Sequence, residues 1–336
     1  MKNNIFEDVV LLPINLALFG EGNTNTTASE GLSDEMKTYY SDYLIDMAEP
    51  ELVHDQFGQK QPIPKNGGKT IQFRKYSPLP KLTTPLEEGK TPDGQTLNMT
   101  IVEATVAQYG GYIELSDMLL LTAIDNNLVQ ATKLLGGQAG RTLDTITREV
   151  LAGGTNVQYA EGQVKARNAL VGGGESGNHY LTVNAVRMAV RTLKRMNAPR
   201  KDGGFVAIIH PDCSYDLMSD PNWKYPHQYQ DTSNIYEGEI GKIEGVRFVE
   251  TSEAKIFEKA GASSRDVYAT IVLGDDAYGV TDIQGGGLQH IVKQLGSAGT
   301  ADPLNQRATA GWKATKTAVR LVEEYMVRIE TTASAS

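Results

Sequence analysis

Two stretches of the chain alternate between apolar and polar residues, which is the pattern of β-strands. Residues 69–76 place Ile71 and Phe73 on one face, and residues 96–113 alternate over an unusually long run. The segment between them is rich in proline, glycine and charged residues, which indicates an irregular connection. The pattern therefore predicts a long two-stranded ribbon with a charged tip. Because an isolated two-stranded ribbon is marginal in water, we expect it to pack on another chain.

A helical period follows the ribbon. Ser116 is a suitable N-cap for a first short segment, residues 125–127 interrupt it, and apolar or small side chains then recur every three to four positions from Leu128 to Leu151. At 1.5 Å per residue this predicts a rod of about 36 Å. Gly136 and Gly137 lie inside it, where each costs about 1 kcal/mol relative to alanine. They are candidate hinge residues.

The composition changes to an α/β pattern after a glycine-rich loop at residues 155–180. Thr182 is a suitable N-cap for a helix with an apolar inner face and a basic outer face. The last strands, at residues 319–329, alternate again, and we expect them beside the long helix. The order predicts a compact α/β domain at residues 178–300, inserted into an elongated domain. The strands expected in it are Phe205–Ile209, residues 246–250 and residues 268–273.

Residues 1–65 form an expected arm before the ribbon. They are mostly polar, and one amphipathic helix is expected after Ser33, so the segment has no core of its own. An apolar run at residues 9–19 is preceded by acidic residues and interrupted by Pro13, which argues against a signal peptide. The sequence contains no other run that approaches the ~20 apolar residues of a membrane span. We therefore expect the arm to lie on a partner.

The charge balance changes the picture of possible partners. The chain has 32 lysines and arginines against 41 aspartates and glutamates, a net charge of -9, which argues against binding nucleic acid through phosphate neutralisation. The basic outer face of the helix after Thr182 permits contact with DNA, but a solvated face or a salt-bridge surface between subunits is favoured in an acidic chain. This basic face consists of Arg187, Arg191, Lys194 and Arg195.

The sequence offers only weak signals for a phosphate-binding, metal or catalytic site. Residues 67–70 resemble the end of a phosphate-binding loop, but Ile63 stands where the first glycine is required. The single cysteine, Cys213, excludes an intrachain disulfide, and the five histidines are dispersed. His210 and Cys213 are a possible base and thiol, although Pro211 between them favours a strand end and a helix start. We expect no catalytic residue, no metal site and no cofactor.

The order of arm, ribbon, long helix, inserted α/β domain and returning strands resembles the Hong Kong 97-type fold of tailed-bacteriophage major capsid proteins. Several short motifs are similar to the subgroup typified by the coat protein of coliphage N four, and the resemblance covers roughly residues 65–330. The motifs are residues 73–76, residues 84–89, residues 108–111 leading to 116–117, residues 138–144, residues 210–212, and residues 238–241 leading to 245–251.

The resemblance implies an α+β fold with four regions. In the family, axial domains cluster at the centres of hexamers and pentamers, and the ribbon lies over a neighbouring subunit. Four charged residues at the ribbon tip, Glu87, Glu88, Lys90 and Asp93, are then candidates for ion pairs between subunits. The implied regions are an N-terminal arm at residues 1–65, an extended β-hairpin (E-loop) at 66–115, a peripheral domain at 116–177 and 301–336, and an axial domain at 178–300.

The resemblance further implies a major capsid protein that forms the icosahedral head around the double-stranded DNA of a tailed phage. Its implied partners are other copies of itself, a portal protein and a separate scaffolding or decoration protein. DNA would be contained without sequence specificity, no membrane would be involved, and virion heads would assemble in the host cytoplasm. Two alternatives remain: a bacterial nanocompartment shell with the same fold, and a cytosolic cysteine hydrolase that uses Cys213 and His210.

Overall fold

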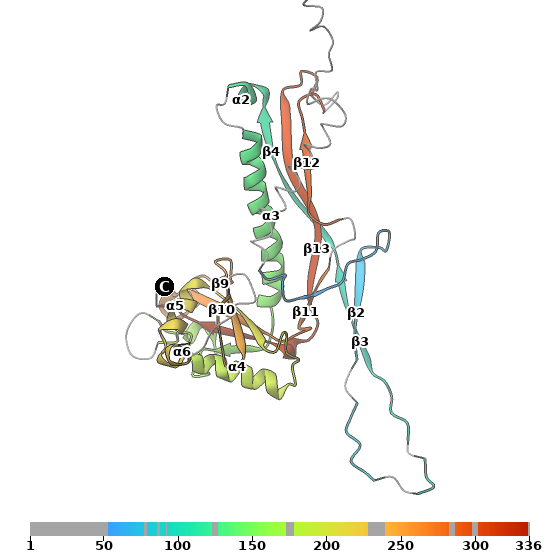
Figure 1. Ribbon diagram of the computed structural model, residues 1–336, viewed down its shortest axis with the longest axis vertical. Coiled ribbons are helices and arrows are strands. Elements are labelled where there is room, and N and C mark those ends of the chain that lie inside the picture. The colour runs from blue at the N-terminus through green and yellow to red at the C-terminus, as the bar shows by residue number, and fades with distance from the viewer. Residues whose placement is uncertain are drawn as a thin grey trace, which may run out of the picture.

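The computed structural model describes residues 53–76, 79–85, 88–91, 93–122, 127–172, 178–227, 239–281, 286–297 and 302–334. Within them the chain forms two sheets, a long helix and a projecting two-stranded ribbon (Figure 1). Most of the expected arm, including the helix after Ser33, lies outside the described residues, as does Glu87 at the ribbon tip. Helices and sheets are both present, in agreement with the predicted α+β class.

The ribbon consists of strands β2 (Thr70–Tyr76) and β3 (Met99–Thr105), which pair antiparallel. Thr70 lies opposite Thr105 at its base, and Tyr76 lies opposite Met99 where the ladder ends. The connection beyond this ladder extends well away from the rest of the chain (Figure 1). The alternation at residues 69–76 therefore predicted the first strand correctly.

The second alternating run, residues 96–113, is divided between two sheets and is not one ribbon strand. Val106 is buried at the division, and its N–H donates to the Lys69 carbonyl oxygen at 2.8 Å. After it, β4 (Ala107–Ser116) leaves the ribbon and pairs antiparallel with β13 (Arg307–Arg320). Alternation marks strands but not their partners, which is why the sequence pattern joined the two.

The long helix α3 (Asn127–Ala152) packs on the sheet that contains β4 and β13. Its buried side chains, such as Leu135 and Leu143, belong to the same apolar cluster as Trp312 of β13, so the apolar period from residue 128 to 151 is confirmed as one helix. The short helix α2 (Asp117–Thr122) precedes it, and Ser116 caps α2 through a 3.3 Å bond from the Leu119 N–H. The other strands of this sheet are β1 (Gln59–Lys60), β11 (Tyr278–Thr281) and β12 (Gln289–Lys293).

A seven-stranded sheet forms the second unit. Helices α4 (Val183–Arg195), α5 (Pro211–Ser219) and α6 (Pro221–His227) cover one of its faces, and the end of α3 with Val53 and Phe57 covers the other. Thr182 caps α4, as predicted, by accepting from the Ala185 N–H at 3.1 Å. The strand order is β5 (Val157–Tyr159), β14 (Met326–Thr331), β10 (Val267–Leu273), β6 (Phe205–Ile209), β8 (Val246–Glu250) and β7 (Glu239–Ile243), with β9 (Ile256–Phe257) on β10. Short 3-10 helices occur at Arg167–Ala169, Ala262–Ser264 and Glu323–Tyr325.

The last strand lies in a different sheet from the one expected. Residues 319–329 were predicted to return beside the long helix, and β13 does run along α3, but β14 pairs with β10 and β5 in the seven-stranded sheet. All six residues of β14 are buried, because the sheet is covered on both faces. The alternation of its sequence therefore does not separate an inner from an outer face. The described chain ends beside α5, where the Ser334 N–H donates to Asp216 at 2.9 Å (Figure 1).

Candidate assembly surfaces

The base of the ribbon is seated on the body of the protein by Phe73. Phe73 of β2 and Ala104 of β3 are buried there. A side chain at Gly279 of β11 would come within 2.8 Å of the Phe73 ring, so a glycine at this position makes room for the ring. The sequence pattern placed Phe73 on one face of its strand but carried no signal for Gly279, because the contact joins distant parts of the chain.

The outer face of the ribbon exposes apolar side chains. Met99 and Ile101 of β3 are 45% and 44% exposed, and Leu97, which precedes the strand, is 68% exposed. Met99 and Ile101 share a face because they are spaced by two along the strand, and Leu97 continues the same spacing before it. Burying apolar surface contributes about 25 cal/mol per Å². A row of apolar side chains that lies open in the single chain therefore indicates a partner surface.

The charged residues predicted at the ribbon tip lie where a neighbour could reach them. Glu88, Lys90 and Asp93 are all exposed, and Glu87 lies outside the described residues. Exposed ion pairs contribute about 0–1 kcal/mol each. Their pairing with a second subunit stays a prediction. We expect such pairs to set the register between subunits and to add little to the strength of binding.

The candidate hinge lies in the middle of an unbroken helix. Gly136 is buried on the inner face of α3, whereas a side chain at Gly137 would meet no atom within 4 Å. Hydrogen-bonded helix runs through both positions, from Asn127 to Ala152. Flexure at this pair stays a prediction.

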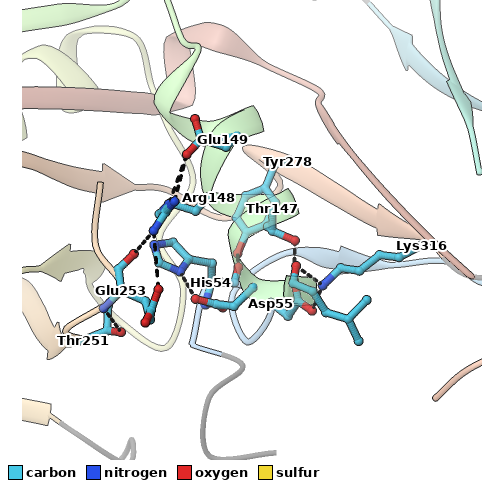
Figure 2. Close-up of polar contacts among 11 residues, drawn as sticks. His54, Asp55, Thr147, Arg148, Glu149, Thr251, Glu253, Tyr278 and Lys316 are labelled. Atoms are coloured by element: carbon cyan, nitrogen blue, oxygen red, sulfur yellow. Dashed lines mark hydrogen bonds and ion pairs between the residues drawn. The ribbon is translucent and has the colours of Figure 1, made fainter. Parts of the chain in front are cut away.

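A buried polar junction joins the start of the described chain to the long helix (Figure 2). Asp144 of α3 accepts a 2.7 Å hydrogen bond from the backbone N–H of His54 and lies 2.6 Å from His54 Nδ1, and both side chains are 0% exposed. The Tyr278 hydroxyl of β11 donates to the His54 carbonyl oxygen, and burial raises the pKa of Tyr278 so that it keeps this proton. His54 is therefore fixed through its ring, its N–H and its carbonyl.

Asp55 extends the junction to the sheet. The Thr147 hydroxyl of α3 donates to Asp55 Oδ1 at 2.6 Å, and the Lys316 ammonium of β13 contacts Asp55 Oδ2. Lys316 Nζ also donates to the Leu143 carbonyl oxygen at 3.0 Å. Figure 2 shows Asp55 between Thr147 and Lys316. Adjacent residues 54 and 55 thus both bind α3 and two strands of the five-stranded sheet, which ties the chain entering from the amino-terminal side to the long helix.

A second buried network holds the C-terminal end of α3. Arg328 of β14 donates to the carbonyl oxygens of Ala152 and, at 3.0 Å, Gly154. Arg320 Nη1, at the end of β13, donates to the Val150 carbonyl oxygen at 2.8 Å. Cations are favourable at a helix C-terminus because they offset its unpaired carbonyl groups. The two strands therefore cap the helix and fix it to both sheets.

Glu330 neutralises the arginine at the centre of this network. It is 0% exposed, accepts from Arg328 Nε at 2.8 Å, and accepts two bonds from Arg167 at 2.7 and 2.8 Å. The bonds from Arg167 to Glu330 raise the pKa of the Arg167 guanidinium. The Arg167 guanidinium also lies 3.5 Å from the centre of the Phe257 ring. A buried charge triad thus links β14, the end of α3 and the loop after β5.

The environment of Cys213, the nucleophile in the hydrolase alternative, does not favour catalysis. Cys213 is fully buried, and burial raises its pKa to about 12, so its thiol stays protonated and unreactive. His210 Nδ1 accepts from the Asp212 N–H at 3.2 Å and caps α5. Among the described residues, no group of histidine, cysteine, aspartate and glutamate could hold a metal ion. Nor does a helix in this part of the chain have the length and apolar character to cross a membrane.

The comparisons with known proteins agree with this architecture. The structure is similar to the capsid of Ralstonia phage GP4, with a TM-score of 0.65 and 14% identity over 83% of this chain and 88% of that chain. It is also similar to the capsid of cyanophage P-SCSP1u, with a TM-score of 0.62 and 13% identity over 84% of this chain and 89% of that chain. For the capsid of cyanophage Pam1 the TM-score is 0.61 and the identity 19%, over 84% of this chain and 90% of that chain. These likenesses confirm the predicted Hong Kong 97-type fold.

The family assignment comes from the sequence itself. No curated protein is similar enough in sequence to be matched to this chain. The family described as phage capsid protein, however, matches residues 120–295, slightly more than half of the chain. This range contains α3, the helices of the seven-stranded sheet and most of its strands. The chain therefore belongs to the phage capsid protein family.

Proposed function

We propose that this chain is the major capsid protein of a tailed phage, and that its hexamers and pentamers form the icosahedral head enclosing the double-stranded DNA genome. The observation that carries the proposal is the exposed apolar face of the ribbon, at Leu97, Met99 and Ile101, in a member of the phage capsid family. In the head this face would lie on a neighbouring copy, where burial stabilises the contact. The family match also favours a phage head over a bacterial nanocompartment shell.

The two sheets suggest how the chain is divided into an axial and a peripheral domain. We assign the seven-stranded sheet and its helices to the axial domain at the centre of each capsomer, and α3 with its long strands to the peripheral domain. Because β5 and β14 pair within the seven-stranded sheet, we place both with the axial domain, although the boundaries proposed from sequence, 178–300 for the axial domain, left them outside it. The arm at 1–65 and the E-loop at 66–115 would then reach neighbouring copies.

Finer assignments extend the same proposal. The motifs quoted from the sequence support the subgroup of coliphage N four, and a portal protein and a separate scaffolding or decoration protein would complete the head. Assembly would take place in the host cytoplasm and need no catalysis by the chain. Packaged DNA would be contained without sequence specificity, in keeping with the net charge of -9. Electron microscopy of heads purified from infected cells would reveal these partners or their absence.

Gly136 and Gly137 support a flexing helix during head expansion. Glycine inside a helix lowers its local stability, and this pair lies where α3 runs beside β13. Hydrogen exchange would then differ between immature and mature shells across residues 128–151. Identical protection in the two forms would contradict a hinge.

Removing the ribbon tip tests the proposed function. The ladder ends at the pair Tyr76 and Met99, so an Asn-Gly turn in place of residues 77–98 closes a short hairpin without disturbing β2 or β3. We expect this variant to fold, with unchanged circular dichroism, and to form no shells by sedimentation and electron microscopy. Lys81→Gln, an exposed residue in an intact tip that is not one of the four candidate contacts, is the matched control and should still assemble. Shells from the shortened variant in wild-type yield would contradict the proposal.

A further inference from the structure

Helix α4 presents a basic stripe that the chain itself leaves largely unpaired. Its inner face is buried in the seven-stranded sheet unit, and its outer face exposes Arg187, Arg191, Lys194 and Arg195. Arg187 pairs with Glu244 at 2.7 Å. The other three contact no carboxylate among the residues that the structure describes. In a chain of net charge -9, such a stripe is a specific surface rather than part of a general excess of positive charge.

Helix α5 and its C-cap residue carry the opposite charge at the same spacing. Asp212, Asp216 and Asp220 follow one another at intervals of four residues, and all three are partly exposed. Each accepts a hydrogen bond from a neutral donor. Asp212 accepts from the Tyr268 hydroxyl at 2.9 Å, Asp216 from the Ser334 N–H at 2.9 Å, and Asp220 from the Val183 N–H at 3.0 Å. Within the described part of the chain no lysine or arginine forms an ion pair with them. Burial lowers the pKa of His210, 3.3 Å from Asp212, which favours its neutral form.

The two stripes are complementary in pitch as well as in charge. Residues four apart on a helix lie on one face and are separated by about 6 Å along its axis, which applies equally to Arg187, Arg191 and Arg195 and to the three aspartates. The helices occupy different places: α4 runs along the lower edge of its unit, and α5 lies at the left (Figure 1). A ring of identical copies needs two different surfaces of this kind on each copy, because its contacts are head to tail.

We propose that the basic stripe of α4 in one copy packs against the acidic stripe of α5 in the adjacent copy of a capsomer ring. The inference rests on the proposed function, since it requires that the copies form rings. Single exposed ion pairs are weak, but a row of them fixes register and direction around the ring and suppresses wrong pairings. The contact is sensitive to salt, because exposed charges are screened at high ionic strength.

A charge exchange tests the pairing. Arg191→Glu places like charges opposite each other, and we expect the protein concentration needed for half-assembly at low salt to rise about tenfold or more. Asp216→Arg should have a similar effect. The double variant restores opposite charges and should assemble at a concentration within about threefold of the wild type. Lys165→Glu, an exposed lysine outside α4, is the matched control and should leave assembly unchanged. Circular dichroism and thermal unfolding verify that each variant folds.

Each other result overturns the inference in a recognisable way. If Arg191→Glu assembles as the wild type does, the stripe makes no contact between copies, while the proposed function stands. If its shells form normally but retain less DNA, the stripe faces the genome instead. If the double variant is no better than the single ones, the two stripes do not face each other. If the wild-type chain forms neither rings nor shells, the proposed function fails, and the inference fails with it.

Discussion

Glu330→Ala is expected to lower the free energy of unfolding by about 3–5 kcal/mol, the cost of breaking a buried ion pair from one side. The substitution leaves Arg328 buried without its carboxylate and removes two hydrogen bonds from Arg167. It also weakens the cap on α3, because Glu330 orients the guanidinium that bonds to the Ala152 and Gly154 carbonyl oxygens. Urea denaturation of the unassembled chain measures the loss.

The control for this prediction is an exposed carboxylate in a strand. Glu114 of β4 is 43% exposed and pairs with Arg307 at 3.3 Å, so Glu114→Ala should change the stability by less than about 1 kcal/mol. Glu330→Gln keeps the shape of the side chain and should fall between the two. If Glu330→Ala costs no more than Glu114→Ala, the triad does not hold the end of α3 in the way described.

Asp144→Ala is expected to cost about 2–4 kcal/mol, because it leaves the backbone N–H and the ring of His54 without their acceptor in a fully buried site. The loss should also be local. With the junction open, the chain around residues 53–57 should become accessible, and limited proteolysis should cleave there before it cleaves the sheets. Chemical denaturation and mapping of the first cleavage site measure the two effects separately.

Glu149→Ala provides the matched control on the same helix. Its carboxylate is 46% exposed and pairs with Lys255 at 2.8 Å, so its loss should cost less than about 1 kcal/mol and leave the proteolysis pattern unchanged. Equal effects of Asp144→Ala and Glu149→Ala would show that the buried junction contributes no more than a surface ion pair.

The local elements were predictable because each leaves a periodic signal. The apolar period from residue 128 to 151 identified α3, and Thr182 and Ser116 identified the starts of α4 and α2 through their side-chain caps. Alternation identified β2 and the fully apolar run identified β6. These features depend on neighbours within a few residues, which the sequence shows directly.

The parts that could not be predicted depend on contacts between distant residues. No residue near His54 in the sequence indicates that its N–H donates to Asp144. The alternation around Arg328 and Glu330 predicts the outer face of a half-exposed strand, although both residues are buried. The division of residues 96–113 at Val106 depends on which strands lie alongside, and alternation is silent on that choice. The tip residues and the glycine pair need a second copy or a second state to be tested.

Cryo-electron microscopy of heads purified from infected cells would show whether the ribbons join neighbouring copies of this chain. We predict closed icosahedral shells of hexamers and pentamers, in which the outer face of each ribbon, at Leu97, Met99 and Ile101, is covered by a neighbouring copy. Heads whose shell lacks this chain would contradict the proposed function, and shells in which this face remains open to solvent would contradict the ribbon contact.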